Sequence, residues 1–445
     1  MKAVFFSLIS LFIISFNAIA EVHVTVYNQD LALIREVREL DFPGGIGEVR
    51  FIDVAARIIP TSVHFKSDGA ELLEQNYEFD LVDAEKLAQK FIDHDVEIID
   101  DDGELFRGVL LSVQSGYVLQ EKDNSVRLLA RDRMANMHFP TLPEGLITRP
   151  TLVWMLNSPK GGKGNAEISY LTNGMNWEAE YVAVTGEDDK SMQFTGWVNI
   201  DNQSGATYEN AKLKLMAGDV QILQPDRDRR YKKTREMALM AADAFGGGFE
   251  EEAFYEYHLY TLQRPSTLKS NQVKQISLFP PASVREVKKE YVIEWEGNKG
   301  KARVTLSFED NEANGLGMPL PKGKVRVYKE TKDGGSEFIG EDRIDHTPQN
   351  EKIKISTGKA FDIVGEQKTI DSRRNGNKTT EEVEIRIRNR KKETVEIKVP
   401  MNFWGDWEIL DATPGWEKKD ARTAEWTLKI KPDEEKVISY RVLKD

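Results

Sequence analysis

The sequence contains no cysteine among its 445 residues. Thiol chemistry, cysteine-ligated zinc and thiolate nucleophiles are therefore excluded. Histidine is also scarce, with six residues, and no His-x-x-x-His or His-Glu-x-x-His spacing occurs. That spacing is what places two zinc ligands on one face of a helix. We therefore expect neither a bound metal nor a cofactor.

Long hydrophobic runs are almost absent as well. The only long one covers residues 3–16, and it is followed by Ala18-Ile19-Ala20 before Glu21. A short apolar run before a small-residue site is typical of a secretory signal peptide, so residues 1–20 are predicted to be removed and the product to be periplasmic or secreted. No later run reaches the roughly 18 residues that a transmembrane helix needs, so no membrane span is expected.

The chain has no excess of positive charge. Its 61 basic and 74 acidic residues give a net charge of −13. Nucleic acids and anionic membrane surfaces attract clustered positive charge. Neither is an expected partner.

The apolar residues alternate along most of the chain, which predicts strands. Residues 21–149 are interpreted as an N-terminal β-domain. One short helix is predicted within it, capped by Asp83, with Ala84, Leu87 and Phe91 on its apolar face. Closely spaced strands follow this helix, so the unit at about 81–140 is predicted to be a small SH3-like or Sm-like barrel.

Residues 150–357 are predicted to form a central β-sandwich. Its centre is the stretch 170–220, interpreted as an antiparallel meander with strands at 176–184, 192–200 and 211–216. Residues 225–255 are basic and Met-rich and then acidic, and they are interpreted as a flexible insertion, helical or disordered. Residues 358–445 are predicted to be an immunoglobulin-like sandwich. The fold class is therefore all-β, built from several antiparallel β-sandwiches.

Two alternating segments resemble each other weakly, at 196–202 and at 384–389. Both end in asparagine, at Asn202 and Asn389. This similarity alone does not establish an internal repeat.

Several passages along the chain are characteristic of one family. They are VTVYNQDLAL at 24–33, LPEGLITRPTL at 142–152, the stretch 170–220, EEAF at 251–254, YHLYTL at 257–262 and GEDRIDHTP at 340–348. These passages resemble the exported, mostly bacterial family of unknown function that is related to the mucoidy inhibitor A protein. The resemblance covers nearly the whole mature chain and implies an exported, β-rich protein with some link to envelope polysaccharide. It implies no reaction and no catalytic residues.

One polar group could carry chemistry. His258, Asp345 and His346 could form an acid/base or metal site if the strands that carry them converge. In the alternative, which we favour, Arg343 pairs with a carboxylate such as Asp342 and His346 shapes a turn.

Three further patterns have a functional and a structural interpretation. Asp100, Asp101 and Asp102 before Gly103 resemble part of a calcium loop, but the later ligands are missing, so a hairpin turn is favoured. Trp404 and Trp407 could stack on a sugar, although aromatic residues at strand spacing usually pack in a core. Glycine and lysine at 317–324 suggest a phosphate loop, which the glycine spacing and the two prolines exclude.

These observations favour an exported, envelope-associated binding or scaffolding protein whose partner is an envelope protein or polysaccharide. The alternative is a periplasmic hydrolase with a site at His258, Asp345 and His346. A third possibility is that the 225–255 insertion is a docking arm for an acidic or apolar partner. The sequence predicts no particular oligomeric state.

Overall fold

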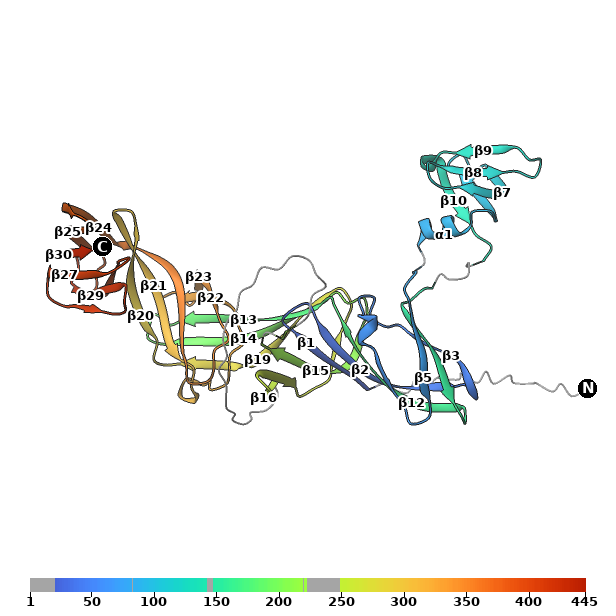
Figure 1. Ribbon diagram of the computed structural model, residues 1–445, viewed down its shortest axis with the longest axis horizontal. Coiled ribbons are helices and arrows are strands. Elements are labelled where there is room, and N and C mark those ends of the chain that lie inside the picture. The colour runs from blue at the N-terminus through green and yellow to red at the C-terminus, as the bar shows by residue number, and fades with distance from the viewer. Residues whose placement is uncertain (1–20, 82, 142–146, 219, 222–248) are drawn as a thin grey trace, which may run out of the picture.

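The computed structural model describes residues 21–81, 83–141, 147–218, 220–221 and 249–445. This part of the chain is mostly strand, arranged in five sheets, and Figure 1 shows the sheets following one another along an elongated molecule. Within these ranges no helix is long and apolar enough to cross a bilayer. The all-β, multidomain prediction is confirmed.

The first body packs an eight-stranded sheet against a three-stranded one. Trp154 is fully buried there and touches Phe51 and Phe65, with ring centroids 5.3 and 5.2 Å away. The larger sheet runs β16 (Phe249–Phe254), β17 (Tyr257–Leu262), β15 (Tyr208–Ala217), β1 (Glu21–Tyr27), β2 (Ala32–Phe42), β12 (Gly162–Thr172) and β4 (His64–Lys66), with β18 (Ser266–Leu268) beside β15. The smaller runs β3 (Gly45–Ile52), β11 (Thr151–Ser158) and β5 (Glu71–Glu78).

A separate five-stranded sheet lies next to the first body (Figure 1). Trp177 and Tyr181, which lie on one face of its central strand, are buried. Its order is β19 (Gln272–Val284), β14 (Met192–Asn202), β13 (Met175–Thr185), β22 (Gly323–Glu330) and β23 (Ser336–Ile344).

The predicted meander is correct for its first two strands and wrong for the third. β13 and β14 form the expected antiparallel pair, but β15 leaves this sheet and pairs in parallel with β1. The reason lies at Asn202, whose side chain bonds main-chain atoms of Ala206, Leu268 and Lys269 and so directs the chain away after β14.

The C-terminal sheet has nine strands in one continuous path. It curls on itself, so that Trp426 on β29 and Tyr440 on β30 stack with centroids 5.4 Å apart. The layers of this sandwich-like unit thus come from a single sheet. Its order is β27 (Trp407–Ala412), β30 (Glu435–Lys444), β25 (Lys378–Asn389), β24 (Lys352–Asn375), β21 (Lys299–Glu309), β20 (Lys288–Glu296), β26 (Val395–Asn402), β29 (Thr423–Ile430) and β28 (Trp416–Lys418).

The small unit near the N-terminus has its own core and stands apart in Figure 1. Its helix α1 (Ala84–Lys90) begins as predicted, with the Asp83 carboxylate accepting the Lys86 N–H at 2.8 Å. The predicted small barrel is not closed: the sheet is open, since no pairing joins its described edge strands β9 and β10. Its order is β10 (Met134–His138), β6 (Asp95–Asp100), β7 (Leu105–Ser112), β8 (Tyr117–Gln120) and β9 (Val126–Leu129).

The sheets cross both boundaries that were predicted between the larger domains. β1 and β2, before residue 150, pair with β15 and β12. β20 and β21, before residue 358, share a sheet and a hydrophobic core with the C-terminal strands. Strand alternation reports the spacing along one strand and not its partner, so pairing between distant segments was not visible in it.

Two predictions fall wholly or partly outside the described residues. The signal peptide at 1–20 does so entirely, and the insertion at 225–255 does so up to residue 248. The prediction of a flexible insertion was wrong for residues 249–254, which form β16, pair with β17 and bury Phe249.

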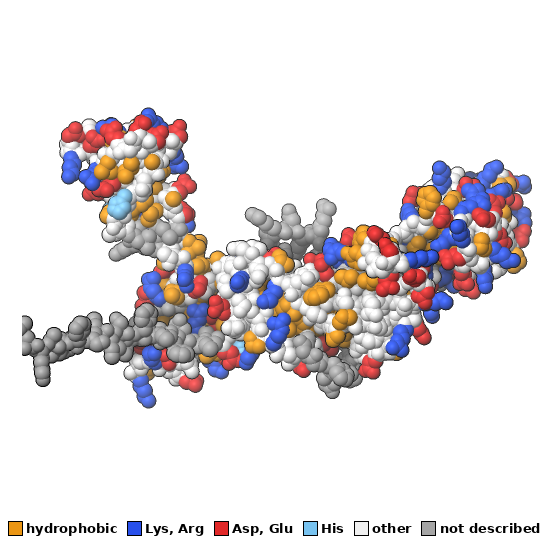
Figure 2. Space-filling model, turned by 180° about the vertical axis from the view of Figure 1, so that it is seen from behind, with side chains coloured by type: hydrophobic (Ala, Val, Ile, Leu, Met, Phe, Trp, Pro, Cys, Tyr) orange, Lys and Arg blue, Asp and Glu red, His pale blue; other side chains and the backbone are white. Residues whose placement is uncertain are grey.

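Over the face drawn in Figure 2, acidic and basic side chains are interspersed.

Candidate functional site

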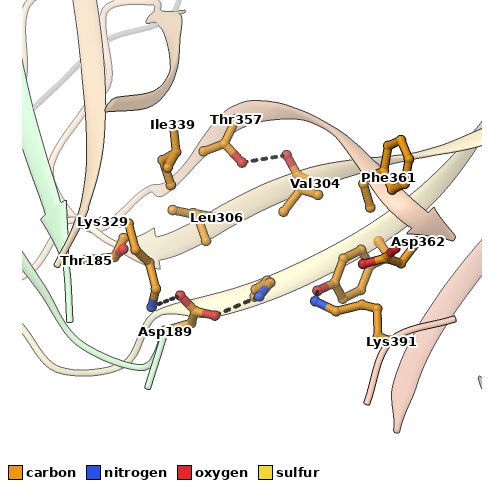
Figure 3. A pocket seen from close by; sticks show the side chains of 13 residues that line it. Thr185, Asp189, Val304, Leu306, Lys329, Ile339, Thr357, Phe361, Asp362 and Lys391 are labelled. Atoms are coloured by element: carbon orange, nitrogen blue, oxygen red, sulfur yellow. Dashed lines mark hydrogen bonds and ion pairs between the residues drawn. The ribbon is translucent and has the colours of Figure 1, made fainter. Parts of the chain in front are cut away.

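An open cavity of about 230 Å³ lies where the five-stranded sheet meets the nine-stranded one. Figure 3 shows its walls, which come from β20, β21, β23 and β24 together with the turn after β13 and the loop after β25. One wall is apolar and consists of Val304, Leu306, Ile339 and Ala360. The other carries charged groups.

An irregularity in β24 brings several groups to this cavity. Lys301 of β21 pairs with Val364, while Arg303 pairs with Lys359, so that the single residue 302 faces four residues of β24. A bulge of this kind re-aims side chains that a regular strand would place in its own face. Ala360, Phe361 and Asp362 are the bulged residues that line the cavity, and Phe361 is 88% exposed at its mouth. Gly358, with φ of +114°, pairs with Val304 and lies between this bulge and a second register shift at Thr357, in a conformation that favours glycine.

A carboxylate in the turn after β13 joins the two sheets. Asp189 Oδ1 accepts from Lys329 Nζ of β22 at 2.6 Å, and its Oδ2 accepts from Lys289 Nζ of β20 at 2.6 Å. Lys329 also donates to the main-chain oxygens of Gly186 and Glu187, at 2.7 and 2.8 Å. All three N–H donors of Lys329 are therefore used within the protein.

A second cation reaches the cavity from the loop after β25. Lys391 Nζ donates to the Tyr291 hydroxyl at 3.2 Å and lies 2.8 Å from Glu393 Oε1. Its position is set by Asn389, which is fully buried and whose Oδ1 accepts the Lys391 N–H at 2.9 Å. The ammonium groups of Lys289 and Lys391 both lie over the Tyr291 ring, 5.6 and 5.5 Å from its centroid.

The hydrogen bonds keep these groups charged. Burial alone would lower the pKa of Lys289, but its bonds to Asp189 and Tyr291 outweigh burial and raise the pKa. The pKa of Lys391 is raised in the same way, against burial, by Glu393 and Tyr291. Burial would raise the pKa of Asp189, yet its two lysine partners hold the pKa below the usual value. At neutral pH the cavity therefore presents ammonium groups opposite an apolar wall, which is an arrangement for binding.

The predicted residue His258 lies on β17, in the first body. Its Nδ1 donates to Glu251 Oε1 of the neighbouring strand at 2.6 Å. This is a cross-strand contact between β16 and β17.

The predicted group at 342–346 lies at the end of β23. Asp342 accepts the main-chain N–H groups of Arg343 and Ser356, at 2.8 and 2.6 Å, while the Arg343 and Asp345 side chains are exposed. His346 Nδ1 accepts the Lys322 N–H at 3.2 Å. These contacts join β23 to β24 and to the loop before β22. In the part of the chain that the structure describes, His258, Asp345 and His346 are not brought together as a metal-binding group.

The acidic run Asp100–Asp102 does cluster, with one ligand atom of each within 4.8 Å of the others. Arg133 pairs with Asp101 at 3.2 Å and with Asp102. The run lies in the tight connection between β6 and β7, as the hairpin interpretation expected.

The two tryptophans differ in their surroundings. Trp404 is 75% exposed and has the Arg422 guanidinium 4.8 Å over its ring. Trp407 packs on Phe403 at 4.8 Å and donates from Nε1 to Ala421 O at 2.8 Å. Trp407 is thus part of the packing, and Trp404 is the accessible one.

The cavity residues were not singled out from the sequence. Lys289, Lys329 and Lys391 look like ordinary charges at strand positions. One signal was available at Gly358, because a glycine within a strand pattern suggests a bulge.

The chain matches a family model over most of its length. Residues 166–444 match the family described as a domain of unknown function, DUF4139. No curated protein matches the chain. All of the residues that line the cavity, from Thr185 to Lys391, lie within the matched range.

Proposed function

The chain belongs to the DUF4139 family, whose function is unknown, and we propose that it is an exported, non-catalytic binding protein of the bacterial envelope. In this proposal the cavity at the junction of the two sheets receives a group presented by an envelope protein or polysaccharide. The single observation that carries it is the cavity itself, where bulged residues of β24 and a lysine–aspartate network face one open space. Concave sites with apolar walls and a few fixed polar groups are typical of ligand binding.

The surroundings of the candidate catalytic residues support binding over hydrolysis. His258 and His346 each bond a neighbouring strand or loop, and no contact between described residues joins them to a shared reaction centre. A general acid or base must reach its substrate and its partner at hydrogen-bond distance.

Export is supported by the sequence pattern at 1–20. The finer family assignment, to relatives of the mucoidy inhibitor A protein, is supported by the passages quoted above. Measuring the intact mass of protein recovered from the periplasm or medium tests export. A mass that begins at Glu21 is expected, and a mass that retains residues 1–20 would contradict export.

A cosedimentation assay with isolated envelope fragments tests the function. Ala360→Trp fills the cavity and should reduce the bound fraction about tenfold or more, because one large side chain excludes any ligand group from the site. Ala253→Trp is the matched control, since Ala253 is exposed on β16 in the first body. Equal binding by wild type and Ala360→Trp, or no binding by wild type, would refute the proposal.

A further inference from the structure

From the donors left in the cavity we infer that it recognises a carboxylate attached to a small apolar body, such as the C-terminal residue of a peptide or a short acyl chain. The inference rests on the proposed binding function and names its ligand class. Four features of the site carry it: the unused ammonium donors, the number of those donors, the apolar wall and the size of the cavity.

The first feature is the count of hydrogen-bond donors. An ammonium group has three N–H donors. Lys329 uses all of them on protein oxygens. Lys289 has two partners, Asp189 and Tyr291, and Lys391 also has two, Tyr291 and Glu393. Lys289 and Lys391 therefore each keep one N–H donor for a ligand, and both ammonium groups lie near the Tyr291 ring.

The number of these donors favours a carboxylate over a phosphate. Two ammonium groups match the two oxygens of a carboxylate. A phosphate offers more acceptor oxygens and is usually bound by arginine forks or by several main-chain N–H groups. Neither an arginine nor a helix N-terminus is among the groups that line this cavity.

The apolar wall and the volume describe the rest of the ligand. Val304, Leu306, Ile339 and Ala360 face the lysines, and Phe361 extends the apolar surface at the mouth. A cavity of about 150 Å³ holds benzene. The 230 Å³ measured here therefore accommodates a body of that size together with a carboxylate.

One charge at the mouth opposes an anion. Asp362 is exposed on the bulge and lines the cavity, and no ion pair joins its carboxylate to another of the described residues. Its carboxylate repels a bound carboxylate by an amount that solvent screening reduces. Asp362→Asn should therefore strengthen binding about two- to threefold, because a nearby like charge is removed.

The experiment titrates the whole mature protein with N-acetyl-L-leucine and with N-acetyl-L-leucinamide, followed by ligand-observed NMR. The acid should bind about tenfold or more tightly than the amide, since only the acid presents an anion to the lysines. Octanoate is titrated in parallel, and the tighter of the two acids shows whether a peptide end or an acyl chain fits better. Equal binding of acid and amide, or no binding of either acid, would overturn the inference.

Variants separate the site from general charge effects. Lys391→Met should weaken the acid about tenfold and leave the amide unchanged. The control is Lys398→Met, which removes the same charge from β26, where Lys398 pairs with Glu290 at 3.0 Å outside the cavity. Lys391→Met removes no partner of Asp189, so the junction of the sheets stays intact. An unchanged affinity for the acid in Lys391→Met would overturn the inference.

The failure of this inference differs from the failure of the proposed function. If Ala360→Trp abolishes envelope binding while acid and amide bind alike, the function stands and the ligand class is wrong. If the acid binds in a Lys391-dependent manner while Ala360→Trp still binds envelope fragments, the ligand site stands and the proposed function is wrong.

Discussion

Asp310, at the end of β21, should make the stability of this protein depend on pH in an unusual direction. Its side chain is fully buried. Oδ1 accepts the Gly317 N–H at 3.0 Å, while Oδ2 has no hydrogen-bond partner among the residues that the structure describes. Burial raises the pKa of Asp310 from 3.8 to about 6, against the opposing effect of the bond from Gly317. Ionising this group therefore costs more in the folded protein than in the unfolded chain.

The sign and the size of the effect follow from this difference in pKa. Well below pH 3.8 the group is protonated in both states and has no effect on the free energy of unfolding. As the pH rises to about 6, the unfolded chain loses its proton first, so the folded state is destabilised. A pKa shift of about two units corresponds to about 3 kcal/mol in the free energy of unfolding. The folded protein loses this stability as the pH rises from about 4 to about 6, and it regains the stability on acidification.

Asp310→Asn removes the titration and keeps an oxygen for the Gly317 N–H. The buried amide group adds a fixed cost of about 1 to 3 kcal/mol, which does not vary with pH. The quantity to measure is therefore the difference in free energy of unfolding between variant and wild type. Urea denaturation followed by tryptophan fluorescence measures this difference. Between pH 4 and pH 8 the variant should become more stable relative to wild type by about 3 kcal/mol.

Ser307→Ala is the matched control. Ser307 is also buried on β21 and its hydroxyl has no hydrogen-bond partner, but it does not titrate in this range. The difference in free energy of unfolding between Ser307→Ala and wild type should be the same at every pH. If the Asp310→Asn difference is also constant within about 1 kcal/mol, the reasoning about Asp310 is refuted.

Five further substitutions test other parts of the structure. Asp83→Ala removes the cap of α1 and should cost about 1 kcal/mol, seen as faster amide hydrogen exchange in that helix alone. Gly196→Val should lower the melting temperature through a cost of about 1 to 3 kcal/mol, because an added Cβ would lie 2.4 Å from the Phe279 ring; an unchanged melting temperature would contradict this packing. His258→Ala and His346→Ala should fold and leave the metal content at background by elemental analysis, whereas a stoichiometric metal lost in both would favour the hydrolase. Asn389→Ala should cost about 2 to 4 kcal/mol by urea denaturation, since the buried side chain satisfies several main-chain groups, and a cost below about 0.5 kcal/mol would show that water replaces it.

The features that the sequence predicted correctly are local. The α1 cap at Asp83 and the β13–β14 pair depend on residues a few positions apart, where spacing and turn chemistry decide the outcome. The β1–β15 pair and the cavity depend on segments far apart in the chain. Nothing in the alternation around Val24 specifies Leu213 as its neighbour.

The weak similarity between 196–202 and 384–389 has a structural counterpart. Asn202 and Asn389 each end a strand, and the Nδ2 of each donates to the main-chain oxygen four residues later. Each Nδ2 also donates to two successive main-chain oxygens of another segment, at 268–269 and at 430–431. The sequence showed only the asparagine at the end of an alternating run. Its role could not be predicted because the accepting oxygens come from chain that is distant in sequence.

The parallel pairing of β1 with β15 sets the order in which the newly made chain can fold. Val24 lies beside Leu213, so β1 can find one of its two neighbours only after nearly half of the protein has been synthesised. At about 5 to 20 residues per second, β1 waits on the order of 10 to 40 s for that partner. During this time it can form a hairpin with β2, but its other edge stays open to pairing with any exposed strand. The N-terminal hairpin is therefore the part of the nascent chain that most needs protection from association with other chains.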